Sequence, residues 1–563
     1  MAAPLTDQIN AIIVEHEAPW SVDGCGVTRR DTQIVALVHR DAYLDDSDRH
    51  RVLIVGAMSG KADDADAAVS ALRAYASSQR LRNRVALSAI PCANPDGLSL
   101  GVGGNGSGGD PSTGYPPQGG YFNHETDPEA RYLWRYIGFM APDYVVEVRV
   151  GDAAAWECAG APSALADALS ARPMPEDSSL LAALARGVPN DLGQVPGIRL
   201  TAPAADVQAE MSKLWSALDG LGTPAASQAR SELASRRSRS LLSVAASLVE
   251  RYGDTLDPVI YTQGVAMSGR LRFGELTGDA TEYAQGIAEL VEPYLSGSKP
   301  WFAESDGGAN HAGLVWCDEM FEVTGDERYR DLLVATADLY RGNDPGVPPP
   351  PCDPDYRTED FFFSGALMGR AYALTGDASY LDIQTEFLLN AEIQQDDGLF
   401  RHCRSVPHYW GRGNGFAALG YAETLTSLPE SHPARGTLIE THTRHLDALR
   451  GLQRPSGMLS QLLDFPGSYQ ELTATCMAGY AAARGLRMGW LDDSYRDFAE
   501  SLWRAASERI DANGAVVDGC TGTGAVDDRR FYLDRAAEYD QDDRTGNLAL
   551  WFAVEMERLR RDD

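Results

Sequence analysis

A short segment in the second half of the chain combines glycines, aromatic rings and charged side chains. Residues 397–402 read Asp-Gly-Leu-Phe-Arg-His, and residues 410–416 read Trp-Gly-Arg-Gly-Asn-Gly-Phe. Glycines let the backbone approach a ligand closely. Trp410 and Phe416 offer flat apolar faces to a sugar ring, and the planar fork of Arg412 suits a carboxylate. The segment predicts a site for an acidic sugar; a glycine turn before a helix is the alternative.

A pair of acids, Glu359 and Asp360, comes directly before the apolar run Phe361-Phe362-Phe363. Burial beside aromatic rings and the neighbouring carboxylate both disfavour the charged form, so we expect the pKa of Asp360 to be raised. A side chain that donates a proton near neutral pH needs such a pKa. The alternative is that Asp360 caps the first turn of a helix.

These residues lie in a stretch that is almost wholly helical from about residue 230 onward and that repeats itself. Segments 269–283, 313–329 and 365–380 each read as a helix that ends in Thr-Gly-Asp, followed by a Tyr that begins another helix. Glycine supplies the left-handed stop, and aspartate can cap the next helix. Weaker copies follow at 415–428, 474–495 and 546–559. Six hairpins of about 50 residues predict a closed (α/α)6 toroid, with an open solenoid as the alternative.

The first part of the chain has a different pattern. Apolar runs at 51–55, 84–90 and 144–148 read as strands, and 62–78 and 127–140 read as helices, which is typical of a parallel α/β sheet. A glycine-rich loop at 101–120 is long enough to be functional or disordered. The chain is therefore expected to be multidomain, with an α/β domain at 1–165, an extension or linker at 166–228 and an all-α domain at 229–563.

The C-terminal domain resembles glycoside hydrolase family 105 and its neighbour family 88, the unsaturated rhamnogalacturonyl and glucuronyl hydrolases. The resemblance covers about residues 230–560 and rests on the two segments above, on 358–368, and on 457–461 and 468–474. It implies a hydrolase that removes a terminal unsaturated uronic acid from an oligosaccharide. In these families an aspartic acid protonates the C4=C5 double bond, water adds at C5, and the resulting hemiketal opens.

The resemblance also implies roles for individual residues. Segment 358–368 is similar to the catalytic-aspartate helix, so Asp360 matches the general acid and base. The implied substrate-binding residues are Tyr261, Asn310, His311, His402, Trp410, Arg412, Asn414, Phe416, Gln461 and Glu471.

Three positions depart from the family pattern. Asn310 or His311 falls nearest to a second family aspartate, Thr358 replaces an aromatic residue and Phe416 replaces a tryptophan. A β-glucuronidase that acts on saturated glucuronides is therefore a second candidate. In such an enzyme, Glu359 or Glu471 would share the catalytic role with Asp360. A sugar epimerase and a non-catalytic glycan-binding protein are further alternatives.

The N-terminal domain resembles the M14 zinc carboxypeptidases through Asn94-Pro95-Asp96-Gly97 and residues 142–149. That fold needs an H-x-x-E pair and a later histidine, but Met58, Lys61 and Arg149 stand near those positions. A zinc site needs nitrogen, oxygen or sulfur ligands that these side chains do not supply. The resemblance implies an inactivated peptidase fold, and neither a catalytic metal nor another cofactor is expected.

The composition limits the partners. The formal charge is −32, and an acidic surface repels nucleic acid and anionic membranes. No apolar run is long enough to cross a bilayer. The N-terminus has no basic region typical of a secretory signal, and the eight cysteines form no CxxC pair, so reduced thiols in a cytoplasmic protein are expected. An oligosaccharide is the expected partner, and a homo-oligomer is left open.

Overall fold

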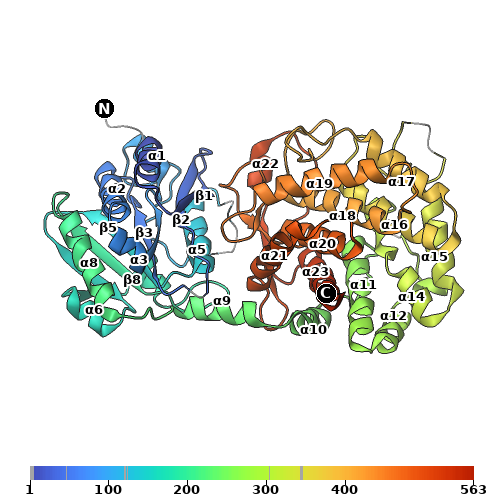
Figure 1. Cartoon of the computed structure of the whole chain (residues 1–563), viewed down its shortest axis with the longest axis horizontal. Helices are drawn as coiled ribbons and strands as arrows, with labels where there is room; N and C mark the ends of the chain where they lie inside the picture. The colour runs from blue at the N-terminus through green and yellow to red at the C-terminus, as the bar shows by residue number, and fades with distance from the viewer. Residues whose placement is uncertain are drawn as a thin grey trace. The chain divides into compact units, whose positions relative to one another are not determined.

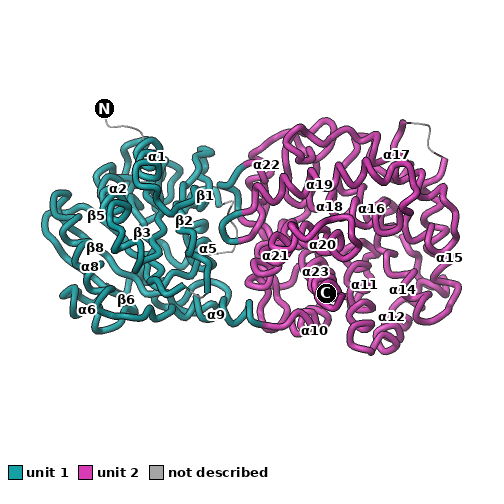
Figure 2. Tube along the Cα trace, in the orientation of Figure 1, with its two compact units in different colours: residues 1–238, 454–456, 465–469 teal, residues 239–453, 457–464, 470–563 magenta. Residues whose placement is uncertain are grey.

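The computed structural model describes residues 5–45, 47–118, 122, 124–302, 305–342 and 346–562. The chain forms two compact units, which Figure 2 colours separately. Unit 1 contains residues 1–238, 454–456 and 465–469; unit 2 contains residues 239–453, 457–464 and 470–563. The end of the glycine-rich loop, at residues 119 and 120, lies outside the described residues.

Unit 1 is built on one sheet with the strand order β1-β2-β4-β3-β5-β8-β6-β7 (Figure 1). Strands β4, β3, β5 and β8 pair in parallel at its centre, whereas β1, β2 and β6 join their neighbours nearer the centre antiparallel. The strands are β1 Trp20–Val27, β2 Gln33–His39, β3 His50–Gly56, β4 Val85–Ile90, β5 Tyr144–Val150, β6 Ala155–Ala159, β7 Arg172–Pro173 and β8 Gly197–Ala202.

Helices pack against the sheet. Strands β3 and β4 are buried along their whole length, as expected for parallel strands that are covered on both faces. The core packs Ile54 and Val146 of the sheet with Leu72 and Trp215 of helices. The helices are α1 Leu5–His16, α2 Ala62–Ala76, α3 Gln79–Arg84, α4 Pro95–Leu100, α5 Pro128–Met140, α6 Ser163–Ala168, α7 Leu180–Leu184, α8 Val207–Leu221 and α9 Gln228–Ser238.

The strands and helices predicted for the α/β domain are confirmed as β3, β4, β5, α2 and α5. Residues 166–228 are part of unit 1, because β8 pairs with β5 and Trp215 of α8 joins the core. The outer strands β1 and β2 were not predicted. Glycines and an aspartate interrupt β1, so its sequence lacks a clear alternation of apolar and polar residues.

Unit 2 is a ring of paired helices (Figure 1). The inner set is α11 Tyr261–Thr277, α13 Gly308–His311 with the 3-10 turn η1 Ala312–Leu314 and α14 Cys317–Thr324, α16 Thr358–Thr375, α18 Gly411–Ser427, α20 Leu472–Met488 and α23 Asp543–Asp562. Each member contacts the next, and α23 contacts α11, which closes the ring. The predicted closed toroid is therefore observed in the described residues, rather than an open solenoid.

The outer set follows the inner helices around the ring, with short elements between them. The outer helices are α10 Leu241–Arg251, α12 Ala280–Leu295, α15 Glu327–Asp338, α17 Ser379–Asn390, α19 Arg435–Gly451 and α21 Arg496–Glu508. The remaining elements are β9 Leu459–Ser460, β10 Gln470–Glu471, η2 Asp493–Tyr495, β11 Val516–Cys520, α22 Arg529–Leu533 and β12 Ala537–Asp540.

The Thr-Gly-Asp repeat ends inner helices as predicted. Gly278, Gly325 and Gly376 follow α11, α14 and α16 with φ of 90°, 70° and 73°, the left-handed conformation that favours glycine. Asp326 accepts a bond from the Arg328 amide, and Asp377 accepts one from the Ser379 amide. The aspartates of these two copies therefore also cap the following turn.

Neighbouring inner helices run in the same direction, as α16 and α18 show. A Cβ on Gly420 would lie 2.4 Å from the carbonyl carbon of Phe361, and one on Gly369 would lie 2.8 Å from the Ser427 hydroxyl. The two helices are therefore parallel, and they approach each other closely at the glycines. Their N-terminal ends consequently lie at the same end of the ring.

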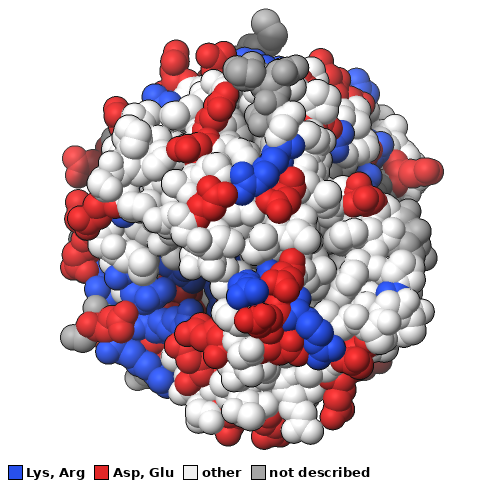
Figure 3. All heavy atoms as spheres, turned by 90° about the vertical axis from the view of Figure 1, so that its right-hand side faces the viewer, with Lys and Arg blue, Asp and Glu red and all other residues white. Residues whose placement is uncertain are grey.

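The surface carries both signs of charge despite the acidic composition. Figure 3 shows Asp and Glu side chains interspersed with Lys and Arg on the face that it draws. None of the helices in the described part of the chain is long and apolar enough to cross a membrane.

Candidate active site

The predicted site residues of unit 2 gather where inner helices begin. Because these helices are parallel, their N-terminal ends lie together, and the positive end of a helix dipole favours an anion such as a carboxylate. The residues at or beside these ends are Tyr261 of α11, Asn310 and His311 of α13, Glu359 and Asp360 of α16, Trp410, Arg412, Asn414 and Phe416 of α18, and Glu471 before α20.

Asp360 lies in the first turn of α16 and is 6% exposed. Its Oδ2 accepts a 2.8 Å hydrogen bond from the amide of Asp353, which precedes the helix. A Cβ added to Gly308 of α13 would lie 3.1 Å from its Oδ1. Burial, together with the neighbouring charges of Glu359 and Asp353, raises the pKa of Asp360 to about 7. The expected shift is thus present, and the bond to Asp353 is not a bond to the first-turn amides of a helix cap.

Glu359 faces a different partner. Its Oε1 lies 3.1 Å from Nε2 of the fully buried His402, whose Nδ1 lies 2.6 Å from the hydroxyl of Tyr532 in α22. Burial alone would raise the pKa of Glu359, but the interaction with His402 outweighs burial and the pKa is lowered. Two adjacent carboxyl groups therefore differ in protonation near neutral pH, an arrangement typical of acid–base sites.

Aromatic rings line the beginning of α11 and α18. Tyr261 packs against Phe363 and Phe416 with ring centroids 5.1 and 5.6 Å apart. The Trp410 ring lies 4.7 Å from the His402 ring, and the Arg412 guanidinium lies 4.7 Å from the Trp410 ring. The structure thus brings these predicted residues together as an apolar wall with cationic and polar groups beside it.

Arg412 is 2% exposed and already bonds to the main chain. Its Nη1 and Nη2 donate to the carbonyl oxygens of Cys520 and Thr521, the latter at 2.8 Å. The guanidinium is therefore held in place by the end of β11, and its fork is only partly free for a ligand. Its Nε is buried without a hydrogen-bond partner among the described residues.

Asn414 and Glu471 hold the backbone of the site. The Asn414 amide donates to the carbonyls of Phe400 and Trp410, and its oxygen accepts bonds from the Phe400 amide and His445. The side chain has no hydrogen-bonding capacity left for a sugar. The carboxylate of Glu471 caps α20 by accepting from the amides of Thr473 and Ala474, and it also accepts from the Cys520 amide. These bonds indicate that both side chains position the backbone of the site, and the substrate contacts predicted for them stay predictions.

Several other predicted residues keep unused polar atoms. Asn310 donates to the Val259 carbonyl and accepts from Ser305, and His311 Nε2 lies 2.6 Å from Asp306 Oδ1. Buried groups normally find partners, so buried atoms without a partner in the described structure suit a ligand. These atoms are His311 Nδ1, Trp410 Nε1 and Gln461 Oε1.

Two residues of the site were not predicted from the sequence. Tyr532 binds His402 from a position far along the chain, and Gly308 leaves room for the Asp360 carboxylate. No local motif marks Tyr532, because the ring of helices brings distant segments together. Gly308 lies in the segment 306–313, whose glycines could have indicated a close approach. In the described part of the chain, no group of three or more His, Cys, Asp and Glu side chains could hold a metal ion.

Comparison with known proteins places unit 2 in a family. The model of Glycosyl Hydrolase Family 88 matches residues 244–560. A possible member of the GH105 family from Klebsiella pneumoniae shares the fold, with a TM-score of 0.50 and 22% identity over 59% of this chain and 94% of that one.

Two curated relatives match shorter segments. An unsaturated 3S-rhamnoglycuronyl hydrolase of Alteromonas sp. (strain LOR) is 28% identical over 25% of this chain, and the unsaturated rhamnogalacturonyl hydrolase YesR of Bacillus subtilis is 30% identical over 27%. The chain spans 38% and 42% of the length of these relatives. Since the family model covers more than half of the chain, the protein belongs to glycosyl hydrolase family 88.

Proposed function

We propose that unit 2 removes a terminal unsaturated uronic acid from oligosaccharides. The observation that carries this proposal is the adjacent pair Glu359 and Asp360, whose pKa values are displaced in opposite directions, that of Asp360 upward to about 7. A carboxyl group that is still partly protonated near neutral pH can donate a proton. Membership of family 88 and the names of the two curated relatives support this activity.

In the proposed reaction, Asp360 transfers its proton to C4 of the C4=C5 bond. Water adds its oxygen to C5 and returns a proton to the Asp360 carboxylate. The resulting hemiketal opens and releases the remaining oligosaccharide. The uronate carboxylate would lie at the N-terminal ends of the inner helices near Arg412, and Tyr261 and Trp410 would contact the sugar ring.

A β-glucuronidase that acts on saturated glucuronides is the second candidate. The same pair supports it, because Glu359 is a second carboxyl beside Asp360, with a side chain that is 13% exposed and a lower pKa. Such an enzyme would use one acid and one base around the glycosidic bond.

Absorbance of the conjugated double bond separates the candidates. Purified protein is incubated with lyase-generated unsaturated disaccharides and, separately, with saturated glucuronides. Loss of absorbance supports hydration of the double bond. Release of glucuronate from the saturated substrate without loss of absorbance supports the β-glucuronidase. No turnover of either, by folded protein, would leave a non-catalytic glycan-binding role.

We further propose that unit 1 is a zinc carboxypeptidase fold that has lost its metal site and now serves a structural or substrate-positioning role. Its parallel strands β4, β3, β5 and β8 support the fold assignment. Met58, Lys61 and Arg149 stand near the expected ligand positions and support the loss of the metal site. Met58 is buried just past β3, and Arg149 pairs with Glu147 at 2.5 Å. Metal analysis of the full chain tests this: stoichiometric zinc in the purified protein would contradict the loss of the metal site.

A further inference from the structure

The other end of the helical ring contains a cavity. It has a volume of about 400 Å³ and lies among the later turns of α11, α14, α16, α18, α20 and α23. On α16 its lining residue Arg370 lies about 15 Å along the helix axis from Asp360, at the rise of an α-helix. None of the predicted site residues lines it. The cavity is therefore separate from the candidate active site.

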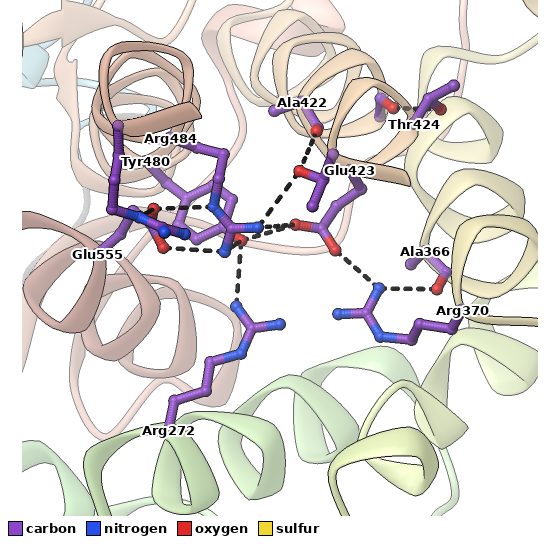
Figure 4. Close-up of polar contacts among 12 residues, drawn as sticks. Arg272, Ala366, Arg370, Ala422, Glu423, Thr424, Tyr480, Arg484 and Glu555 are labelled. Atoms are coloured by element: carbon purple, nitrogen blue, oxygen red, sulfur yellow. Dashed lines mark hydrogen bonds and ion pairs between the residues drawn. The ribbon is translucent and has the colours of Figure 1, made fainter. Parts of the chain in front are cut away.

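A buried network of ion pairs forms the floor of this cavity (Figure 4). Glu423 accepts bonds from Arg370 at 2.7 Å and from the Tyr480 hydroxyl at 2.6 Å. Arg484 pairs with Glu555 at 2.8 Å. Arg272 donates to Glu319 at 2.6 Å. Positive and negative side chains are interleaved, so the floor carries little net charge.

Hydrogen-bonding groups remain unused around this floor. Arg272 and Arg370 are 6% and 8% exposed, and the Nη2 of each has no hydrogen-bond partner in the described structure. Figure 4 shows both guanidinium groups directed toward the middle of the ring. Within the same described residues, Glu319 Oε2 is buried without a hydrogen-bond partner. Asp318 Oδ1 lies 3.3 Å from Arg370 Nε in an ion pair. Free donors and a free acceptor thus lie around one cavity.

We propose that this cavity binds a neutral, hydroxyl-rich small molecule, namely a monosaccharide or a polyol. Each hydroxyl group donates and accepts, so neighbouring hydroxyls satisfy arginine nitrogens and carboxylate oxygens together. An anion would meet the negative ends of the inner helices and the acids Glu275 and Glu322 at the lining. A cation would meet the arginines of the floor. The balanced charge and mixed hydrogen bonding therefore favour an uncharged ligand.

Binding of glucose, galactose, mannose, rhamnose and glycerol to the full chain tests the proposal by saturation-transfer NMR, with glucuronate as the charged comparison. The key variant is Ala373→Tyr, because Ala373 lines the cavity and is exposed, so the larger side chain fills the space without disturbing the core. Ala378→Tyr is the matched control, since Ala378 is also exposed and does not line the cavity. Asp318→Asn is a second probe that keeps the shape of the cavity.

At least one neutral probe is expected to bind, and its affinity should fall about tenfold or more in Ala373→Tyr while Ala378→Tyr binds normally. Asp318→Asn should change the affinity for the same probe by at least about threefold, because it removes the negative charge that pairs with Arg370 beside the cavity. The proposal is overturned if no neutral probe binds at about 100 mM, which corresponds to negligible affinity. It is also overturned if Ala373→Tyr leaves binding unchanged, or if glucuronate competes equally at this cavity. These measurements of binding do not depend on the proposed activity.

Discussion

The hydroxyl of Tyr532 lies 2.6 Å from Nδ1 of His402, on the side of the ring opposite to Glu359. Burial raises the pKa of Tyr532, so its hydroxyl keeps a proton to donate. The Val526 amide donates to the same hydroxyl oxygen at 3.4 Å. Tyr532 and Glu359 thus contact the two ring nitrogens of His402, and Tyr532 is a positioning residue for this ring.

Tyr532→Phe removes this hydroxyl and keeps the ring. We expect kcat on unsaturated disaccharides to fall about tenfold, with a smaller change in KM, because His402 loses the hydrogen bond that fixes its ring beside Glu359. The shape of the pH profile should change as well, which a purely structural loss would not cause. Tyr495→Phe is the control, since it removes a 2.7 Å bond to Asp447 on an outer helix. An unchanged kcat and pH profile in Tyr532→Phe would remove the positioning role.

The sequence predicted the helical ring well because its repeat is local. Each Thr-Gly-Asp stop sits next to the helix that it ends, so the pattern along the chain reports directly on the turn at Gly278, Gly325 or Gly376. The acid pair was found for the same reason: Glu359, Asp360 and the phenylalanines that follow belong to one helix.

Contacts between distant segments were harder to predict. Asn414 and Glu471 are of residue types common in sugar sites, but their polar atoms turn out to bond to the main chain of Phe400, Ala474 and Cys520. Which partner an amide or carboxylate finds depends on how the ring closes, and one sequence does not contain that information. The same limit concealed the contact of Tyr532 with His402.

Gly308→Ala tests the packing around Asp360. The new Cβ would lie 3.1 Å from Asp360 Oδ1, so we expect the carboxylate to be displaced and turnover to fall about tenfold. Stability should change little, because alanine favours a helix more than glycine does. Gly307→Ala is the matched control, since its Cβ would meet no atom within 4 Å. Equal activity in the two variants would show that the carboxylate tolerates the contact.

Arg412→Lys keeps the charge and loses the planar fork. Because the guanidinium donates to the carbonyls of Cys520 and Thr521, we expect a loss of about 1–3 kcal/mol in the free energy of unfolding as well as weaker substrate binding. Denaturant unfolding and KM are measured on the same preparation. An unchanged KM would remove Arg412 from the uronate site and leave it a structural residue only.

The pH dependence of the wild-type enzyme should reflect the acid pair. Asp360 must be protonated to act, and its pKa is about 7, so kcat/KM should fall about tenfold per pH unit well above pH 7. The pKa of Glu359 is lowered from 4.5, so its ionised form persists down to more acidic pH. We expect nearly constant activity between these limits, measured on an unsaturated disaccharide. Activity that rises from pH 7 to 9 would contradict the role of Asp360 as the acid.

Asp360→Asn separates chemistry from folding. The pKa of Asp360 is raised from 3.8 to about 7 by burial, so the folded state binds more protons than the unfolded state between these values, and wild-type stability falls as pH rises through them. This loss in the free energy of unfolding is at most about 4 kcal/mol at pH 8. Asparagine does not ionise, so it avoids the loss, and it can still accept a hydrogen bond from the Asp353 amide. The variant should therefore be more stable than the wild type at pH 8, equally stable near pH 4, and about 10²-fold slower in turnover.

Glu359→Gln is the control of opposite sign. The pKa of the Glu359 carboxyl is lowered, so this substitution should reduce the free energy of unfolding at pH 8. Unfolding at pH 4 and 8 and turnover are measured for both variants. A stable Asp360→Asn protein with near-normal turnover would move the acid role to Glu359.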